Sequence, residues 1–208
     1  LPPFISLGNQ QGNFAFTAHD MDSAAPLGAS SVTLQWSNVN VSGFTNLNLS
    51  LFLAEDDDGT NQDWDASDSL VIEIQPNGVG GFTKVFGVES ELVGTSQTNK
   101  TPRVDTDLNG IGSATDPEIT DIFTQHSISI ADAGTLDIRL TITGINGNEE
   151  DIAFDNLQLE GDVAATPPSL LSFTRQNPLG VNTNADSLVF RATFSEDVQN
   201  VTGNDFFA

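Results

Sequence analysis

Apolar and polar residues alternate along much of this chain, and this two-residue period constrains its fold more than any other feature. The clearest sets are Val32, Leu34 and Trp36; Leu47, Leu49 and Leu51; and Leu136, Ile138, Leu140 and Ile142. Successive side chains of a β-strand point to opposite faces, so this pattern is typical of a strand with one buried face. No window longer than ten residues has the apolar period of a helix. We therefore expect an all-β protein.

The expected strands are too many and too widely spaced for a single hairpin sheet. Further candidates, separated by Gly, Asn, Asp and Ser clusters, are residues 13–18, 69–76, 82–88, 120–130 and 151–160. Long acidic connections between such strands favour two packed antiparallel sheets rather than a closed barrel. We predict that residues 1–162 form a jelly-roll-type β-sandwich with calcium-binding loops.

Residues 163–168, with the sequence Val-Ala-Ala-Thr-Pro-Pro, interrupt the strand pattern. Proline cannot donate to a β-ladder, so we expect a linker here. Beyond it, residues 169–208 contain two further strand patterns. The sequence Asp-Ser-Leu-Val-Phe-Arg-Ala-Thr-Phe-Ser-Glu-Asp-Val at 186–198 resembles the opening of bacterial immunoglobulin-like domains, which implies an incomplete Ig-like β segment. Such a half-domain exposes strand edges and an apolar face, which predicts strand addition between copies of the chain.

Residues 55–68 carry seven carboxylates in fourteen positions, between two expected strands. These carboxylates repel one another, and this repulsion predicts a bound cation. The loop offers oxygen ligands and no Cys or His, which favours calcium, with its about six to eight oxygen ligands, over magnesium or zinc. The expected ligands are Glu55, Asp57, Asp63, Asp65 and Asp68. The alternative is a solvated acidic loop.

Trp64 lies inside this acidic loop. Its ring could pack over the ion-filled loop and exclude water, which is the interpretation we favour. The alternative is that it presents its ring to a sugar.

A second acidic loop, residues 105–116, has the residue spacing of a calcium-binding loop. Its oxygen ligands would be Asp105, Asp107, Asn109 and Asp116, with Gly110 at the turn. The flanking residues do not look helical, so we expect a lone calcium loop rather than an EF-hand. The alternative is an Asx-rich turn without metal.

The alternation changes phase within residues 148–159. Apolar residues occupy even-numbered positions up to 154 and odd-numbered positions from 157. Because the period of a strand is two, this change predicts a β-bulge near Asp155 and Asn156. Depending on where the bulge falls, Asp155 could turn toward the interior.

Acidic residues near the start of the chain could meet the acidic residues of this last strand. Asp20 and Asp22 lie on one side of an extended segment, and we expect them to share an ion with Asp151 or Asp155. A buried carboxylate without compensation is too costly to expect, and a metal would supply the compensation.

Charge and composition restrict the partners. The net charge is −23, from 29 acidic and 6 basic residues, which excludes nucleic acid and anionic membrane surfaces as main partners. No apolar stretch approaches membrane-spanning length, so we expect no membrane insertion. The chain has no cysteine, and calcium could replace disulfides as a source of rigidity outside the cell. We therefore expect a secreted or cell-surface protein.

Four motifs in order carry a resemblance to a known family. They are Phe-Thr-Ala-His-Asp-Met-Asp at 16–22, the acidic stretch 54–65, Val-Asp-Thr-Asp at 104–107 and Glu-Asp-Ile-Ala-Phe-Asp-Asn-Leu at 150–157. Together they resemble the calcium-associated β-sandwich modules of large secreted and surface proteins of bacteria, over about residues 10–161. The resemblance implies an accessory or structural role without catalytic residues.

Three classes of function are compatible with these features. The favoured one is a non-catalytic, calcium-stabilised extracellular structural or adhesive module, as part of a large adhesin or a repeating subunit of a surface filament. The second is a carbohydrate-binding module attached to a secreted enzyme and bound to polysaccharide through Trp36 or Trp64. An enzyme is the least favoured class, because no histidine-supported nucleophile, phosphate loop or basic cleft accompanies the carboxylates.

Overall fold

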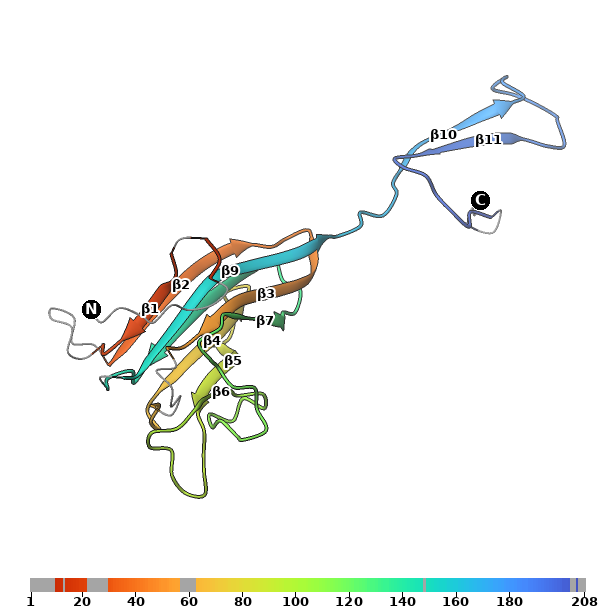
Figure 1. Cartoon of the computed structure of the whole chain (residues 1–208). Helices are drawn as coiled ribbons and strands as arrows, with labels where there is room; N and C mark the ends of the chain where they lie inside the picture. The colour runs from red at the N-terminus through yellow and green to blue at the C-terminus, as the bar shows by residue number, and fades with distance from the viewer. Residues whose placement is uncertain are drawn as a thin grey trace. The chain divides into compact units, whose positions relative to one another are not determined.

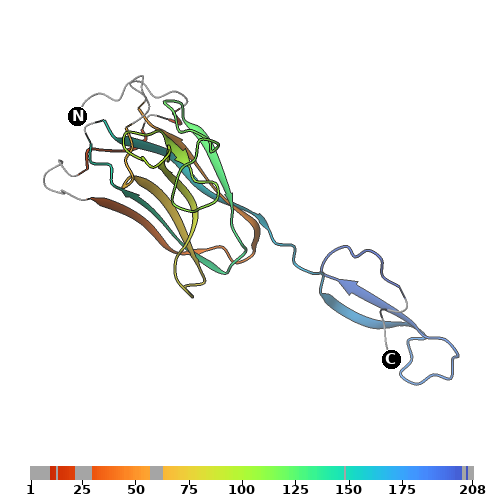
Figure 2. The ribbon, with the colours of Figure 1, turned by 90° about the horizontal axis from the view of Figure 1, so that it is seen from below.

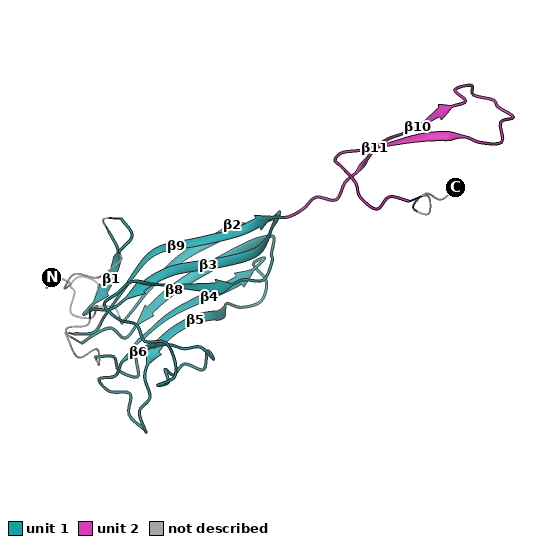
Figure 3. Ribbon diagram, turned by 45° about the vertical axis from the view of Figure 1, so that its right-hand side comes forward, with its two compact units in different colours: residues 1–163 teal, residues 164–208 magenta. Residues whose placement is uncertain are grey.

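The computed structural model describes residues 10–12, 14–21, 30–56, 63–147, 149–202 and 205. Within these ranges the chain forms strands in antiparallel sheets and no α-helix, which confirms the expected all-β class. None of the described segments is a helix that could cross a bilayer. The chain divides into two compact units, Leu1–Val163 (unit 1) and Ala164–Ala208 (unit 2), coloured separately in Figure 3.

Unit 1 is a β-sandwich of two sheets (Figures 1 and 2). Its strands are β1 (Phe16–His19), β2 (Ser31–Asn40), β3 (Phe44–Ala54), β4 (Ser69–Pro76), β5 (Thr83–Ser90), β6 (Pro102–Val104), β7 (Thr124–Ser129), β8 (Thr135–Thr143) and β9 (Asp151–Val163). One sheet has the order β1-β9-β3-β7, and the other has the order β2-β8-β4-β5-β6. The jelly-roll type of this sandwich stays a prediction.

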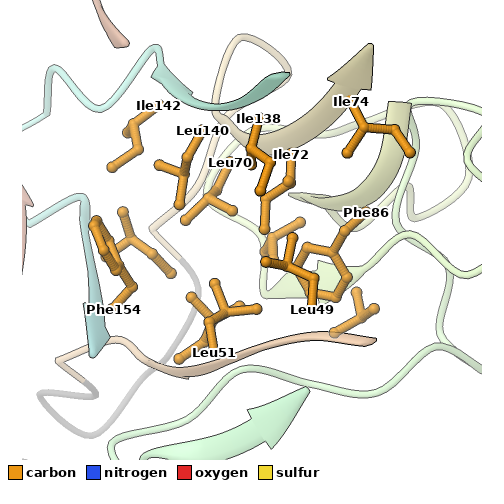
Figure 4. Packing of buried hydrophobic residues seen from close by; sticks show 14 of the residues in the cluster. Leu49, Leu51, Leu70, Ile72, Ile74, Phe86, Ile138, Leu140, Ile142 and Phe154 are labelled. Carbon is orange, nitrogen blue, oxygen red and sulfur yellow. The ribbon is translucent and has the colours of Figure 1, made fainter. Parts of the chain in front are cut away.

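The apolar residues of the alternating segments form the core between the sheets. In β4 and β8 every second residue is buried, as the two-residue period requires. Leu49 and Leu51 of β3 point toward Ile72 and Leu140 of the opposite sheet (Figure 4). Each such side chain contributes about 1.5–3 kcal/mol through burial, so the core supplies the main driving force for unit 1.

The first half of β9 is buried on both faces. Ile152 and Phe154 face the main core, while Ala153 packs with Ala54 and Phe123 in a second cluster on the outer side of the sheet. Part of this cover comes from residues just before β7, which is shorter than the expected strand 120–130. A small apolar cluster therefore covers the outer side of the sheet at this end.

The β-bulge predicted from the change of phase is confirmed. Between β3 and β9 the register shifts where Ser50 faces Gln158 and Phe52 faces Asp155, and Asn156 in this interval has a φ of 50°. Asn is one of the residues that tolerates this left-handed conformation. Because Asp155 lies opposite Phe52, it stays on the outer face, before the bulge changes the phase.

Unit 2 is a single antiparallel hairpin of β10 (Leu170–Asn177) and β11 (Val189–Phe194). Phe173 and Phe190 stack with ring centroids 5.0 Å apart, yet both remain about half exposed, at 50% and 46%. Two-stranded hairpins are marginally stable in water without a further layer. The Ig-like nature of this unit stays a prediction.

Candidate functional site

Four buried carboxylates gather at one end of the sandwich, which we call the acidic end. Glu55 follows the last residue of β3, Asp68 precedes β4, and Glu150 and Asp151 stand at the start of β9. Their side chains belong to residues only 1–6% exposed. Carboxylates are rarely buried to this extent unless a partner compensates their charge.

Asp151 ties the start of β9 to the acidic loop. Its Oδ1 accepts a hydrogen bond of 2.8 Å from the amide of Asp56, and its carbonyl oxygen accepts one of 3.0 Å from Nε1 of Trp64. The Trp64 residue is 1% exposed and exchanges backbone hydrogen bonds with Lys100. The indole is therefore buried and is not available to stack on a sugar.

Asp68 has a strongly perturbed pKa at the acidic end. Burial, together with the negative charges of Glu150 and Asp65, raises the pKa of Asp68 to about 7. The amide of Asp65 donates a hydrogen bond to Oδ2 of Asp68, which opposes this rise only in part. The electrostatic environment of Asp68 therefore favours either a proton or a cation.

The backbone approaches Asp68 closely at Gly144, which has a φ of +88°. A Cβ atom built there would lie 2.3 Å from Oδ1 of Asp68 and 2.4 Å from the carbonyl oxygen of Ser67. Only glycine fits such a position without a shift of the backbone. The turn after β8 and the carboxylate before β4 are therefore fixed against each other.

Glu150 lies at the wall of a cavity of about 310 Å³, lined also by Asp63, Asn99, Gly147 and Glu149. Its Oε2 accepts hydrogen bonds from the amides of Asn146, at 2.6 Å, and Gly147. The cavity walls are mainly polar and include three carboxylate residues. Such a cavity has the donor chemistry that a hard cation requires.

Two carboxylates of the acidic end, Asp68 and Glu150, are in none of the ion pairs found among the described residues. The ion pairs among the described residues join Lys84 to Glu89 and Asp105, Arg103 to Glu91 and Glu118, and Arg139 to Glu73. Within the described ranges, neither Asp68 nor Glu150 has a Lys or Arg partner. No group of three or more His, Asp or Glu side chains in these ranges is arranged to hold a metal ion.

The first and last strands of unit 1 are neighbours, with His19 directly opposite Asp151 in the β1–β9 pair. Asp20 follows with a φ of 43°, at the same end of the sandwich as Asp151. Asp155 accepts a hydrogen bond of 2.8 Å from the amide of Gln11. Asp22 and Asp57, the other two expected ligands of this region, lie outside the described residues.

The expected ligand Asp65 takes part in a separate contact of the same end. Its Oδ1 accepts a hydrogen bond of 2.9 Å from the amide of Asn99, beside the cavity at Glu150. The sequence interpretation did not include Glu150 or Asn99 as site residues. Glu150 could have been predicted as a site residue from its position just before the alternating residues of β9. No feature of the sequence marks Asn99 as one.

The loop 105–116 is closed by its own hydrogen bonds and by a lysine from β5. Asp105 Oδ2 accepts hydrogen bonds from Nζ of Lys84 at 2.7 Å and from the amide of Gly110 at 2.8 Å. Burial would raise the pKa of Asp105, but the Lys84 ammonium and the Gly110 amide outweigh it and lower the pKa below its ordinary value. A cation therefore already faces this carboxylate, which fits the alternative of an Asx-rich turn.

The remaining expected ligands of this loop bond to their neighbours. Asp116 accepts hydrogen bonds from Thr106 and from both the amide and the hydroxyl of Ser113. Asp107 Oδ2 accepts one of 2.9 Å from Nδ2 of Asn109. Calcium binding by this loop stays a prediction.

The acidic end thus brings together Glu55, Asp56, residues 63–68, the start of β9 and the turn after β8. The loop 105–116 is a separate feature, in which the Lys84 ammonium faces Asp105. No protein-family model matches the chain, and no curated protein matches it in sequence.

Proposed function

We propose that this chain is a non-catalytic structural or adhesive module of an extracellular protein, stabilised by calcium at the acidic end. The observation that carries the proposal is the burial of Asp68 and Glu150 close to each other without a Lys or Arg partner in the described residues. Two neighbouring buried carboxylates repel each other and have lost their hydration, so they favour a bound cation.

Calcium suits this place better than other common ions. The available donors are carboxylate and amide oxygens on loop segments, and the chain has no cysteine. Calcium accepts such ligands in variable geometry, whereas magnesium requires a tight octahedron and zinc prefers His or Cys. Calcium is abundant outside cells, which supports a secreted or cell-surface location.

The experiment is thermal unfolding of the full chain in calcium, in magnesium and in excess chelator. We expect the melting temperature to be highest in calcium, because an ion that binds only the folded state stabilises it by mass action. The same series on D132N, which removes an exposed carboxylate outside the acidic end, is the control. Equal melting temperatures in calcium and chelator would overturn the proposal.

Self-association is the second part of the proposed role. Unit 2 presents a hairpin whose apolar residues, including Leu171, Phe173 and Phe190, remain largely exposed. A partly completed β-layer of this kind supports the proposal that unit 2 begins an Ig-like fold and that another strand-bearing segment completes it. Repeated contacts of this type would build a filament or a multi-module adhesin.

Carbohydrate binding is the alternative proposal, and one residue still favours it. Trp36 is 39% exposed, in contrast to the buried Trp64. Its surroundings, Val39, Ile138 and Leu157, are aliphatic and offer few hydrogen bonds to a sugar. Binding to a polysaccharide that is lost in W36A would support this alternative.

A further inference from the structure

One edge of the first sheet is only half covered. Strand β1 pairs with β9 only at Asp151–Phe154, although β9 continues to Val163. The amide of Gln11 bonds to the Asp155 side chain, but among the described residues no strand pairs with the outer edge of 157–163. Unpaired N–H and C=O groups at such an edge form a template for an added strand.

Beneath this open edge the core is also incomplete. A cavity of about 200 Å³ lies between the two sheets, lined mainly by the apolar residues Trp36, Val39, Leu49, Ile138, Leu157 and Leu159. Leu157 and Leu159 point inward from β9 but are only half buried. The feature that would complete this region is a strand with apolar residues on one face.

Strand β11 has that pattern. Phe190, Ala192 and Phe194 share one face, while Arg191 and Thr193 share the other. It pairs with β10 on one side, and within the described residues no strand pairs with its other edge. The free edge of β11 can therefore pair with the edge of another sheet while β11 stays paired with β10.

We propose that β11 of a second copy of this chain adds antiparallel to the β9 edge, with Arg191 opposite Glu160. This register places Phe194 beside Leu157, Ala192 beside Leu159, and Phe190 beside Gly161. The apolar face then covers the cavity, and the aromatic ring of Phe190 lies next to a residue without a side chain. The proposal rests on the self-association in the proposed function and names the surface that receives the hairpin.

Charge complementarity supports a β11 strand of this sequence, supplied by a second copy, as the occupant. Glu160 and Asp162 project from the outer face of β9, and both are exposed. In the proposed register Arg191 lies on this same outer face, because directly opposed residues share a face of a sheet. Unit 1 carries most of the acidic residues, so the arginine of a second chain meets an acidic surface.

The contact is heterologous, because it joins the hairpin of one copy to the sandwich of the next. Each added copy then leaves one hairpin and one β9 edge available, and the association can continue. We therefore expect assemblies that grow with concentration rather than a closed dimer.

Disulfide trapping in calcium tests the register directly, because the chain has no cysteine of its own. E160C and R191C are prepared as separate full chains, mixed and oxidised, and mixed disulfides are identified by mass spectrometry. The control pairs E160C with V181C, whose side chain is at a similarly exposed site of unit 2. We expect E160C–R191C dimers well above the control. A yield equal to that of the control would overturn the proposal.

The double variant E160C/R191C distinguishes a second copy from the chain's own hairpin. A crosslink that forms between chains and increases with concentration supports the proposal. A crosslink that stays within one chain at every concentration would contradict the choice of a second copy as the occupant.

A charge exchange provides an independent test by sedimentation velocity in calcium. E160R and R191E should each weaken association by about fivefold or more, and E160R/R191E should restore it, because the pair is re-formed with reversed charges. Association that is absent in the unmodified chain, or indifferent to all three variants, would overturn the proposal. Calcium-dependent melting with no association would refute this inference and leave the calcium proposal intact.

Discussion

Replacing Asp68 by asparagine should stabilise the protein in chelator and weaken its response to calcium. The pKa of this carboxyl rises from 3.8 to about 7, mainly because it is buried and because Glu150 and Asp65 repel it. At about 1.4 kcal/mol per unit the full shift corresponds to about 4 kcal/mol. Solvent screening reduces this value, so we expect D68N to gain about 2 kcal/mol at pH 8 in chelator.

The assay is thermal unfolding of the unmodified chain, D68N and the control D132N, in chelator and in calcium. A gain of about 2 kcal/mol corresponds to about 4–8 °C for a unit of this size. In calcium the advantage of D68N should shrink to about 0.6 kcal/mol, because the amide cannot supply a charged oxygen and a tenfold loss of affinity removes about 1.4 kcal/mol of stabilisation.

The pH dependence gives the same test a second readout. The folded-state pKa of Asp68 is raised, so its contribution to stability is fully present below about pH 4 and is lost as the pH rises through about 7. In chelator the unmodified chain should therefore lose stability over this window relative to D68N. A D68N chain that melts below the unmodified chain in chelator, or gains equally from calcium, would refute the reasoning.

Three further predictions concern other parts of unit 1. G144A should unfold about 2 kcal/mol more easily than the matched control G80A in urea titrations, because both glycines have positive φ but only Gly144 lacks room for a Cβ. K84M should lower the free energy of unfolding by about 3 kcal/mol in urea titrations with chelator, because the buried Asp105 carboxylate loses the Lys84 ammonium. A smaller loss in calcium would show that a bound calcium ion replaces the ammonium. Burial lowers the pKa of His126, so stability should fall as the pH drops below about 6.5, and H126F, followed by the same pH series of melts, should remove this component.

The strand pattern could be predicted from the sequence wherever one face of a strand is buried. Strand β4 spans Ser69–Pro76, the range expected from the alternation, and the bulge at Asn156 follows from a change of phase. Strand β6 was missed, because its three residues at 102–104 are too short to show a period and begin with proline. The segment 120–123 is not part of strand β7, although its apolar residues suggested a strand. Phe123 packs instead with Ala54 and Ala153.

The candidate site was predictable as a region but not as a set of contacts. The density of carboxylates in 55–68 marks the acidic end, and Glu55 and Asp68 are indeed buried there. The partners from distant segments, such as Glu150 and Gly144, depend on strand pairing, which one sequence does not encode locally. Lys84 likewise reaches Asp105 across 21 residues of sequence, so spacing within 105–116 could not show that a cation already lies there.

The two halves of β9 differ in their surroundings, and this difference should divide one strand into two regions of local stability. Ala153 and Phe154 pair with both β1 and β3, and the residues 151–154 are buried, so their amides should exchange hydrogen only when unit 1 unfolds. Beyond the bulge, 157–163 pairs with β3 alone and alternate amides point to the open edge. Hydrogen exchange along this strand should therefore become sharply faster after Asn156. The second half of β9 can then open locally while the first half stays folded.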